Sequence, residues 1–381
     1  MSTINKTKTN ALSKKIIDAA DCIVIKIGSA LLVDEKSNSV RENWLGSVAA
    51  DVHRLKSEGK RVVIVSSGSI ALGRHLLSLP ATPLNLEKSQ AAAAVGQIFL
   101  AQSYKLSLDK YQIVAAQILV TAEDSQNRRR YLNCRATLLK LLEMGVVPIV
   151  NENDTIATDE IKFGDNDRLA AQIASLCEAN VLVLLSDVDG LYTSNPDQDR
   201  KAQHVPIVRS VTPEVEAMVK DNESHFSKGG MRTKIDAARV CMSTGSHMVI
   251  TSGRELNPLR KLRSGHTSTW FLSSKDPIAA RKQWIFNTKP KGKIFIDLGA
   301  EIAILKGKSL LPAGVIKCEG RFQRGDTVMI ISSKGRSLAN GLSCYSDEEV
   351  SLIKGCQSSE IATVLGHPGR SVLIHRNDMA I

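Results

Sequence analysis

The feature that most constrains the fold is a regular alternation between short apolar runs and longer stretches with helical periodicity. Apolar runs typical of strands buried on both faces occupy residues 22–28, 61–66, 113–120, 146–150 and 181–185. Helical patterns lie between and after these runs, over residues 42–58, from residue 70, and over 87–108, 124–143 and 165–179. Parallel strands need such crossover helices, which pack on both faces of the sheet. The sequence therefore predicts an α/β domain with a three-layer, doubly wound, mostly parallel sheet.

The pattern changes toward the C-terminus. A loop with an extra strand pair is expected over residues 188–211, a helix over 229–244 and a strand over 248–251. After Pro290 the helical period disappears, and short runs separated by Gly-containing turns predict a small β-rich domain with strands at 293–298, 328–332, 360–365 and 372–375. We expect a disordered tail, a large domain, a linker and a small domain at residues 1–15, 16–275, 276–289 and 290–381.

The positive net charge is compatible with more than one class of anionic partner. The 381 residues carry a formal net charge of +11, with a pI near 9.3, and only 4% are aromatic. A positive bias suits nucleic acid, and it equally suits an enzyme whose substrates are polyanions. The scarcity of aromatic side chains argues against stacking on bases as the main activity. Nucleic acid is therefore not expected as a partner.

The cysteines and the N-terminus indicate a cytoplasmic protein. The seven cysteines form no C-x-x-C pair, which is typical of reduced thiols in the cytosol. Residues 1–15 are polar and lack the apolar segment of a signal peptide. No apolar run approaches the roughly 18 residues that span a bilayer, so no membrane partner is expected.

Polar residues and glycines gather where the predicted strands end. In a doubly wound sheet, ligands bind beyond the carboxyl ends of the strands. The residues at these ends, together with a Gly-rich segment that opens a later helix, are Lys26, Gly28, Ser29, 66–69, 151–154, Ser186, Asp187, Asp189, Gly190 and 228–234. A further helix begins with Asp165, Asn166 and Asp167, although helix capping needs only one of them. The surplus suggests side chains aimed at lysines, an amine or a metal.

Two Gly-rich turns, each with a lysine, point to phosphate chemistry. Glycine lets backbone N–H groups approach phosphate oxygens, and a helix N-terminus adds its dipole. Neither a Walker A motif nor a G-x-G-x-x-G motif is present. Lys26 lies inside an apolar strand, so its ammonium group needs a partner. Phosphoryl transfer explains this set, because two lysines would offset the negative charge of the transferred group while a carboxylate between them organises both.

A carboxylate acceptor fits the same residues. It is already ionised at neutral pH and needs no general base. Of the histidines, His225 alone falls in these loops, and we interpret it as a loop residue. Mg²⁺ is expected with the nucleotide, although the sequence assigns no metal ligand.

Seven segments in this order resemble the amino acid kinase family, and within it the enzymes that phosphorylate glutamate. They are Ile25-Lys-Ile-Gly-Ser29, Val65-Ser-Ser-Gly-Ser-Ile70, Ala94-Val-Gly-Gln97, Pro148-Ile-Val-Asn-Glu-Asn-Asp154, Phe163-Gly-Asp-Asn-Asp167, Ser186-Asp187 and Gly229-Gly-Met-Arg-Thr-Lys234. Residues 290–375 resemble the PUA domain, a fold otherwise known from RNA-modifying proteins.

The resemblance implies ATP-dependent phosphorylation of the γ-carboxylate of L-glutamate, the first step of proline synthesis, with Mg²⁺ as cofactor. It implies that Lys26 and Lys234 stabilise the transferred phosphoryl group and that Asp167 orients them. The residues that it implies for glutamate are Ser67, Asn151, Asp154, Asp165 and Asn166. Those for ATP are Lys26, Gly28, Gly68, Ser186, Asp187, Lys228, Gly229, Gly230, Met231, Arg232, Thr233 and Lys234.

Further partners also follow from the resemblance: proline as an inhibitor, other copies of the chain in a homo-oligomer, and a glutamyl phosphate reductase that receives the labile product. The nearest alternative is another acyl-phosphate-forming kinase. An N-acetylglutamate kinase should have a second glycine after Gly28 and no C-terminal domain, and an aspartokinase should have a different, ligand-sensing one. RNA binding by the C-terminal domain is the other alternative. That domain has no dense basic stripe, so a role in stability or assembly is preferred.

Overall fold

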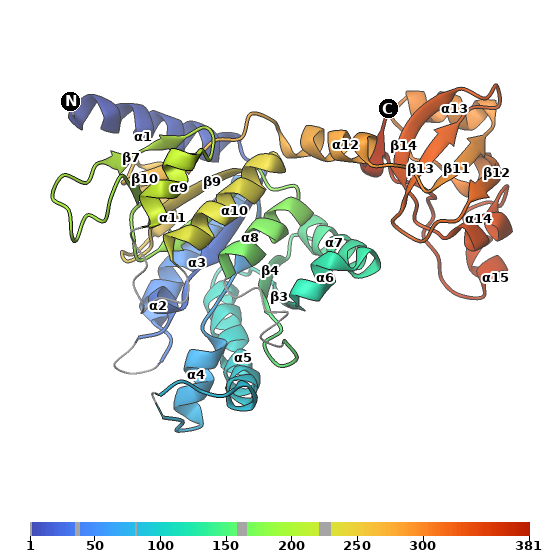
Figure 1. Ribbon diagram of the computed structural model, residues 1–381. Helices are drawn as coiled ribbons and strands as arrows, with labels where there is room; N and C mark the ends of the chain where they lie inside the picture. Colours follow the sequence, from blue (N-terminus) through green and yellow to red (C-terminus); the bar gives the residue numbers. More distant parts are fainter. Residues whose placement is uncertain (1, 35–38, 81, 158–165, 221–229) are drawn as a thin grey trace. The chain divides into compact units, whose positions relative to one another are not determined.

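The chain forms two units, each built around its own sheet (Figure 1). The computed structural model describes residues 2–34, 39–80, 82–157, 166–220 and 230–381. The larger unit contains the chain up to Gln126 together with Cys134–Pro277, and the smaller one contains Asn127–Asn133 and Ile278–Ile381. The domain limits predicted from the sequence remain a proposal about which parts fold independently.

The larger unit is organised around an eight-stranded sheet within the described residues, with the order β3-β4-β2-β1-β5-β9-β10-β8. The neighbouring strands run parallel, except for the antiparallel pair β9 and β10. Its strands are β1 (Cys22–Ile27), β2 (Arg61–Val65), β3 (Ala115–Val120), β4 (Val147–Glu152), β5 (Val181–Ser186), β8 (Ile207–Val208), β9 (His247–Ser252) and β10 (Ser268–Phe271). The predicted doubly wound, mostly parallel sheet is confirmed, and β1, β2, β3, β4, β5 and β9 are the strands that the apolar runs indicate. The short strands β8 and β10 toward one edge were not predicted as members of this sheet.

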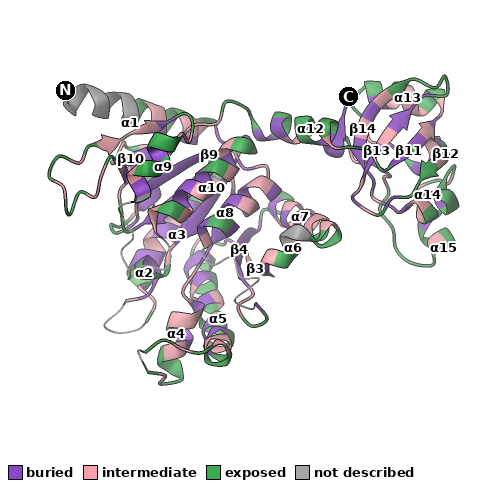
Figure 2. Cartoon of the chain, viewed as in Figure 1, coloured by how far each residue is buried: buried purple, intermediate pink, exposed green. Residues whose placement is uncertain are grey.

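Helices pack on both faces of this sheet, as Figure 2 shows by the buried strands between them. On one face lie α1 (Ser2–Ala19), α3 (Glu42–Ser57), α5 (Leu86–Asp109) and α11 (Pro258–Arg263). On the other lie α8 (Asn166–Leu176) and α10 (Met231–Ser243), which pack on each other, and α9 (Pro213–Lys220) packs against α10. Ile23, Ile25 and Ile27 of β1 pack into the first layer. Because strand side chains alternate, Lys26 points to the second layer, toward α8.

Shorter elements complete the larger unit. They are α2 (Ser29–Leu32), α4 (Ser69–Leu76), α6 (Ala122–Gln126), α7 (Arg128–Glu143, whose first residues belong to the smaller unit), β6 (Leu191–Tyr192) and β7 (His204–Val205). The pairing of β6 with β7 confirms the predicted strand pair. The predicted helix over 124–143 is instead two helices, because the Asn127 side chain accepts a hydrogen bond from the Arg130 amide at 3.2 Å and caps a new helix. No helix of the described ranges is long and apolar enough to cross a membrane.

The N-terminal segment differs from the expected disordered tail, because helix α1 begins at Ser2 and continues to Ala19. Its later residues are held by the larger unit. The Trp270 indole donates a hydrogen bond to Ser13 at 2.9 Å, and Ile17 is buried in the core. Lys60 donates to the carbonyl groups of Asp18 and Ala20. These contacts come from residues far along the chain, so local composition does not reveal them.

The smaller unit contains a five-stranded sheet in the described residues, with the order β12-β11-β13-β14-β15. Its strands are β11 (Gly292–Ile296), β12 (Val315–Gly320), β13 (Thr327–Ile331), β14 (Ser337–Leu342) and β15 (Met379–Ala380). Its helices are α12 (Pro277–Asn287), α13 (Leu298–Leu305), α14 (Asp347–Ile353), α15 (Ile361–Leu365) and the 3₁₀ turns η1 (Pro312–Gly314) and η2 (Arg376–Asp378). The predicted β-rich character is confirmed.

Three details of that prediction are wrong. Residues 360–365 form helix α15 rather than a strand, since an apolar run of this length does not distinguish the two. Residues 372–375 form no strand and make one isolated bridge, between Leu310 and Ile374. The helical period also persists after Pro290, in α13 and in α14, which begins with a capping box of Ser346 and Glu349. The expected linker is occupied by α12.

Helices α4 and α5 touch through their backbones at two glycines. A Cβ atom at Gly73 would lie 1.8 Å from the Ala92 carbonyl oxygen, and one at Gly96 would lie 1.8 Å from that of Ser69. We therefore expect Gly73→Ala to lower the free energy of unfolding by at least about 3 kcal/mol, because backbone atoms cannot move aside as a side chain can. Urea denaturation followed by circular dichroism measures this change.

The matched control is Gly46→Ala in α3, where a Cβ atom would meet nothing within 4 Å. That substitution should be neutral or should stabilise the protein by up to about 1 kcal/mol, because alanine favours the helix. If both substitutions changed the free energy of unfolding equally, the close contact between α4 and α5 would not require glycine at position 73.

Candidate functional site

A cluster of two lysines and one aspartate lies at the carboxyl end of β1. The Lys26 Nζ atom is 2.5 Å from Asp167 Oδ1, and the Lys234 Nζ atom is 3.0 Å from Asp167 Oδ2. The Asp167 side chain has 0% exposure, and those of Lys26 and Lys234 are only 10% and 8% exposed. The structure thus brings together three residues that are far apart in the sequence and that the sequence analysis assigned to one site.

The two ammonium groups decide the charge state of Asp167. Burial alone would raise the pKa of this carboxyl, but Lys26 and Lys234 outweigh burial and hold the pKa below its usual value. Asp167 is therefore an anion at neutral pH, and the cluster of Lys26, Asp167 and Lys234 carries one net positive charge. A buried site that gathers two lysines is suited to attract an anionic ligand.

The fold positions this cluster through two helix starts. Asp167 lies in the first turn of α8, and Lys234 lies in the first turn of α10, whose N-cap is Gly230. Thr233 donates a hydrogen bond to the Gly230 carbonyl at 2.8 Å and lies 3.4 Å from Asp167 Oδ2. Since the N-terminus of a helix carries partial positive charge and free N–H groups, both helices add to the attraction for anions.

A network of side-chain amides lies beside the cluster. The Asn166 amide nitrogen lies 2.7 Å from Ser67 Oγ, 2.7 Å from the Ser66 carbonyl and 3.1 Å from Asn151 Oδ1. Asn151 in turn donates to Gln97 Oε1 at 2.8 Å. The network therefore joins residues at the carboxyl ends of β2 and β4 to the start of α8.

Two members of this network were not assigned from the sequence. Ser69 donates to Asp154 Oδ2 at 3.3 Å and so links Asp154 to the network. Gln97 lies within one of the seven family segments, but its position on a helix gave no sign of which way it faces. Its direction follows from the neighbouring Gly96, which brings α5 against the start of α4.

A cavity of about 710 Å³ opens beside Lys234. Of the residues assigned to ATP, those that line it are Asp187, Gly230, Met231 and Lys234. Ser186 donates a hydrogen bond to Asp187 at 3.0 Å and so orients it. Asp189, which the sequence analysis placed at the end of the same strand as Asp187, also lines the cavity. Further wall residues that sequence reasoning missed include Tyr192, Arg254, Lys261 and His266. His266 thus lines the cavity from a loop outside those that the sequence analysis considered.

The remaining assigned residues have different places. Gly68 adopts a φ of 111°, which favours glycine, and caps α4 directly after β2. Gly28 caps α2, close to the end of β5. The Arg232 side chain is exposed and does not line the cavity. Asp165, Lys228, Gly229 and His225 lie outside the described residues.

The described residues contain no cluster of three or more His, Cys, Asp or Glu side chains that could hold a metal ion alone. The cavity wall does carry the carboxylates of Asp187 and Asp189. Mg²⁺ commonly binds to one or two carboxylates together with water and substrate phosphates. The residues present therefore fit an ion that arrives with a nucleotide, whereas Asp167 is already engaged by two lysines.

Comparison with known proteins gives consistent matches. The sequence profile described as the amino acid kinase family matches residues 21–252, and that of the PUA domain matches residues 292–365. The chain is 55% identical over 365 residues to the glutamate 5-kinase of Dinoroseobacter shibae, covering 96% of this chain and 99% of that protein. It is 57% identical over 362 residues to the glutamate 5-kinase of Roseobacter denitrificans, covering 95% and 97%.

Among solved structures, the carbamate kinase of Giardia lamblia aligns with 68% of this chain and 100% of its own, at 17% identity and a TM-score of 0.49. The two profiles confirm the family resemblance and the C-terminal PUA domain that the sequence indicated.

Proposed function

The chain belongs to the amino acid kinase family, and from this premise we propose that it phosphorylates the γ-carboxylate of L-glutamate with ATP, the first step of proline biosynthesis. The product is L-glutamyl 5-phosphate. The observation that carries the proposal is the cluster of Lys26, Asp167 and Lys234 between an amide network and a nucleotide-sized cavity.

The reaction is a direct in-line transfer. A γ-carboxylate oxygen of glutamate attacks the γ-phosphorus of ATP, the bond from that phosphorus to the bridging oxygen breaks, and ADP leaves with the electron pair. The carboxylate is ionised at neutral pH, so no protein group has to remove a proton. Catalysis therefore rests on positioning and on charges that oppose those of the transition state.

The charge cluster supplies those opposing charges. Lys26 and Lys234 would face the transferred phosphoryl group, and Asp167 would hold both ammonium groups in place through its two oxygens. Such a preformed arrangement in a buried site needs no reorganisation as charge develops. The N-terminus of α10, with Gly230 as its cap, would add backbone N–H groups.

The amide network is proposed to bind glutamate. Asp154 offers a carboxylate for the substrate's α-ammonium group, while Ser67, Asn151 and Asn166 offer hydrogen bonds to its carboxylates. Asp165 belongs to the same proposal from the sequence. Proline carries an ammonium and a carboxylate group on one carbon, as glutamate does, so we propose that it inhibits by occupying the same groups.

The cavity is proposed to hold ATP. Gly230, Met231 and Asp187 line it, and Ser186 orients Asp187. Gly28, Gly68, Lys228, Gly229, Arg232 and Thr233 remain proposed contacts of the nucleotide from the family resemblance. Asp187 and Asp189 are the residues that would hold Mg²⁺, which when bound would neutralise charge on the phosphates.

The test is the formation of a hydroxamate when hydroxylamine traps the acyl phosphate product. Glutamate with ATP and Mg²⁺ should give γ-glutamyl hydroxamate, and added proline should reduce the rate. N-acetylglutamate and aspartate should give little product. A preference for either of these two substrates would assign the chain to a different kinase of the family.

Replacement of Gln97 tests the glutamate site. Gln97→Ala removes the acceptor that orients the Asn151 amide, and we expect the KM for glutamate to rise about three- to tenfold with little change in kcat, as for one lost hydrogen bond. Gln102→Ala, an exposed position on the same helix, is the control. An unchanged KM for glutamate in Gln97→Ala would show that the amide network does not take part in binding glutamate.

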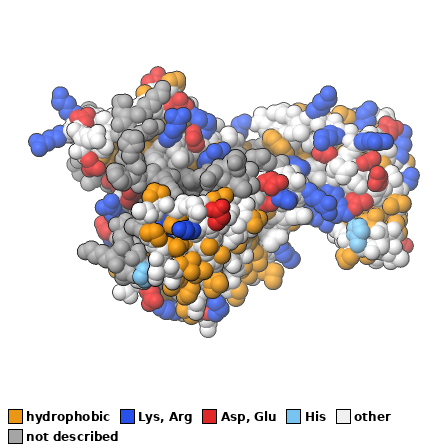
Figure 3. All heavy atoms as spheres, turned by 60° about the horizontal axis from the view of Figure 1, so that its bottom comes forward, with side chains coloured by type: hydrophobic (Ala, Val, Ile, Leu, Met, Phe, Trp, Pro, Cys, Tyr) orange, Lys and Arg blue, Asp and Glu red, His pale blue; other side chains and the backbone are white. Residues whose placement is uncertain are grey.

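We also propose that the chain forms a homo-oligomer through the face that carries α4 and α5. Figure 3 shows hydrophobic side chains gathered there, and the exposed ones include Leu76, Leu77, Ile98, Phe99 and Leu106. A contiguous apolar surface of this kind is typical of an interface. Light scattering should find an oligomer that Ile98→Asp weakens, and a monomeric wild type would contradict this proposal.

Transfer of the labile product to glutamyl phosphate reductase is proposed on chemical grounds alone.

A further inference from the structure

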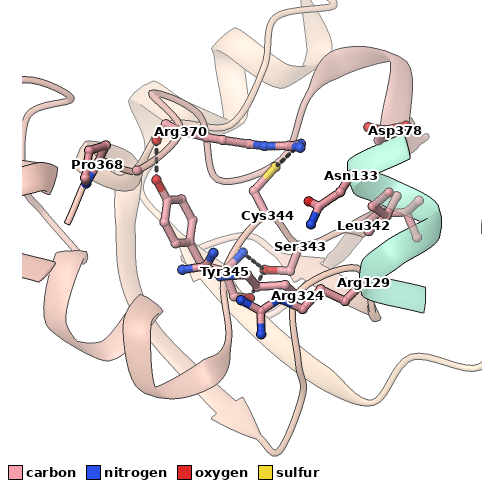
Figure 4. Close-up of a pocket in the computed structure, with 12 residues that line it drawn as sticks. Arg129, Asn133, Arg324, Leu342, Ser343, Cys344, Tyr345, Pro368, Arg370 and Asp378 are labelled. Atoms are coloured by element: carbon pink, nitrogen blue, oxygen red, sulfur yellow. Dashed lines mark hydrogen bonds between the residues drawn. The ribbon is translucent and has the colours of Figure 1, made fainter. Parts of the chain in front are cut away.

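A second cavity, of about 340 Å³, lies within the smaller unit and shares no residue with the candidate kinase site. Its wall is formed by the start of α7 and by the segments around Ser343 and Arg370 (Figure 4). The volume is in the range of sites for small organic molecules. Neither the charge cluster nor the amide network contributes to it.

Three arginines give this cavity a positive wall. Arg324 is neutralised by Glu349, which accepts hydrogen bonds from both its Nε and Nη2 atoms. Arg129 is exposed and makes no ion pair with the residues that the structure describes. Arg370 donates to the Cys344 sulfur at 3.8 Å, a thiol whose pKa is raised mainly by burial, so this partner is uncharged.

The one acidic residue in the wall, Asp378, does not balance these charges. It accepts hydrogen bonds from Arg281, at 3.1 Å from Nε and 2.6 Å from Nη2, and this pair is buried. The guanidinium groups of Arg129 and Arg370 thus remain for a ligand. Arginine suits phosphate and carboxylate groups because its planar fork can donate two parallel hydrogen bonds.

The rest of the wall is partly non-polar. Leu132, Leu342 and Pro368 line the cavity together with the arginines. Figure 4 shows Arg370 extending over Cys344, while Arg129 and Asn133 approach from the helix on the other side. A ligand that fills this space would place carbon atoms against the leucines and anionic groups against the arginines.

The cavity is preformed by packing on both sides. Arg128 donates to the Gly325 carbonyl at 2.9 Å and stacks on Trp284, and this holds the helix turn that carries Arg129. On the opposite side, the Tyr345 hydroxyl donates to the Arg370 carbonyl. A Cβ atom at Gly369 would lie 2.6 Å from that hydroxyl, so the loop is closely seated. A ligand would therefore find both arginine backbones already in place.

We propose that this cavity binds a small organic anion with at least two negative charges, held by Arg129 and Arg370 against a non-polar wall of Leu132, Leu342 and Pro368. Phosphate and paired carboxylates share this chemistry. The proposal favours a small molecule over RNA because Arg129 and Arg370 line one cavity that also has a non-polar wall, whereas RNA binding typically uses cations spread along a surface groove.

The experiment is calorimetric titration of the full chain with phenyl phosphate, isophthalate, phenol and a single-stranded ten-nucleotide RNA. We expect phenyl phosphate or isophthalate to bind and phenol not to bind, and the better of the two identifies the anionic group. Arg129→Ala and Arg370→Ala should each weaken binding about ten- to hundredfold, as expected for lost charge-assisted hydrogen bonds.

Arg321→Ala is the matched control, because it removes the same charge from an exposed position of the smaller unit outside the cavity. Circular dichroism of each variant shows that it is folded, and these exposed side chains should not affect folding. If Arg321→Ala weakened ligand binding as much as the other two substitutions, the effect would come from the net charge of the protein and not from the cavity, and the proposal would be overturned. So would binding of the RNA alone, or binding of none of the probes.

Discussion

Replacing Lys234 with alanine should lower kcat by about 10²- to 10³-fold, the usual effect of removing one preorganised charge from a transition state. The Lys234 ammonium lies 3.0 Å from Asp167 and borders the proposed nucleotide cavity, so it is placed to meet the transferred phosphoryl group. The KM values should change less than kcat, because the opposing charge matters most when the phosphoryl group is between donor and acceptor. Steady-state kinetics with glutamate and ATP measure both.

Folding should survive this change, because Asp167 keeps its contact with Lys26 at 2.5 Å. Arg239→Ala is the control: it removes a cation from an exposed position on the same helix. Its kcat should be close to that of the unmodified protein. An active Lys234→Ala enzyme would remove this residue from the mechanism.

Replacing Asp167 should affect stability and activity together. Asp167→Asn leaves the ammonium groups of Lys26 and Lys234 in a buried site without the carboxylate between them. Breaking a buried ion pair by removing one partner costs about 3–5 kcal/mol. For a unit of this size that corresponds to a decrease in Tm of about 10 °C. Activity should fall by at least as much as in Lys234→Ala, because neither lysine is then held toward the phosphate.

A double variant separates the two effects. Asp167→Asn combined with Lys26→Met removes one of the two uncompensated ammonium groups, so part of the lost stability should return while activity stays low. Recovery of activity in the double variant would show that Asp167 serves folding alone. No recovery of Tm would show that charge burial is not the cause of the instability.

The pH dependence of this stability follows from the direction of the Asp167 shift. Its pKa is lower in the folded protein than in the unfolded chain, where it is about 3.9. The ion pairs therefore contribute fully above the unfolded value, and the contribution is lost as the pH falls through the folded pKa. The difference in stability between the unmodified protein and Asp167→Asn should be constant above about pH 5 and should shrink in acid.

Sequence reasoning predicted the part of the site that depends on strand order. Lys26 follows from an apolar run that must be a buried strand, and Asp167 from a helix start with more acidic residues than capping needs. Parallel strands deliver their carboxyl ends to one edge of the sheet, so Lys26 is expected at that edge. Its grouping with Asp167 and Lys234 came from the resemblance to the family.

Residues placed by contacts between distant elements could not be predicted in this way. Gln97 lies in a helix whose exposed and buried faces are set by its contact with α4. His266 and Arg254 reach the cavity from loops that carry no phosphate-binding pattern. The short apolar run at Ile361–Leu365 fits a strand or a helix equally well, and only its packing in the C-terminal core decides.

Two helices that meet main chain to main chain have no side chain between them that could change rotamer and absorb a displacement. Gly73 and Gly96 join α4 and α5 in this manner. Ser69 is the first residue of α4, and Gln97 follows Gly96 in α5. The side chains that contact Asp154 and Asn151 are therefore carried by one rigid pair of helices. A displacement of the outer surface of α4 and α5 would therefore be transmitted to the proposed glutamate site.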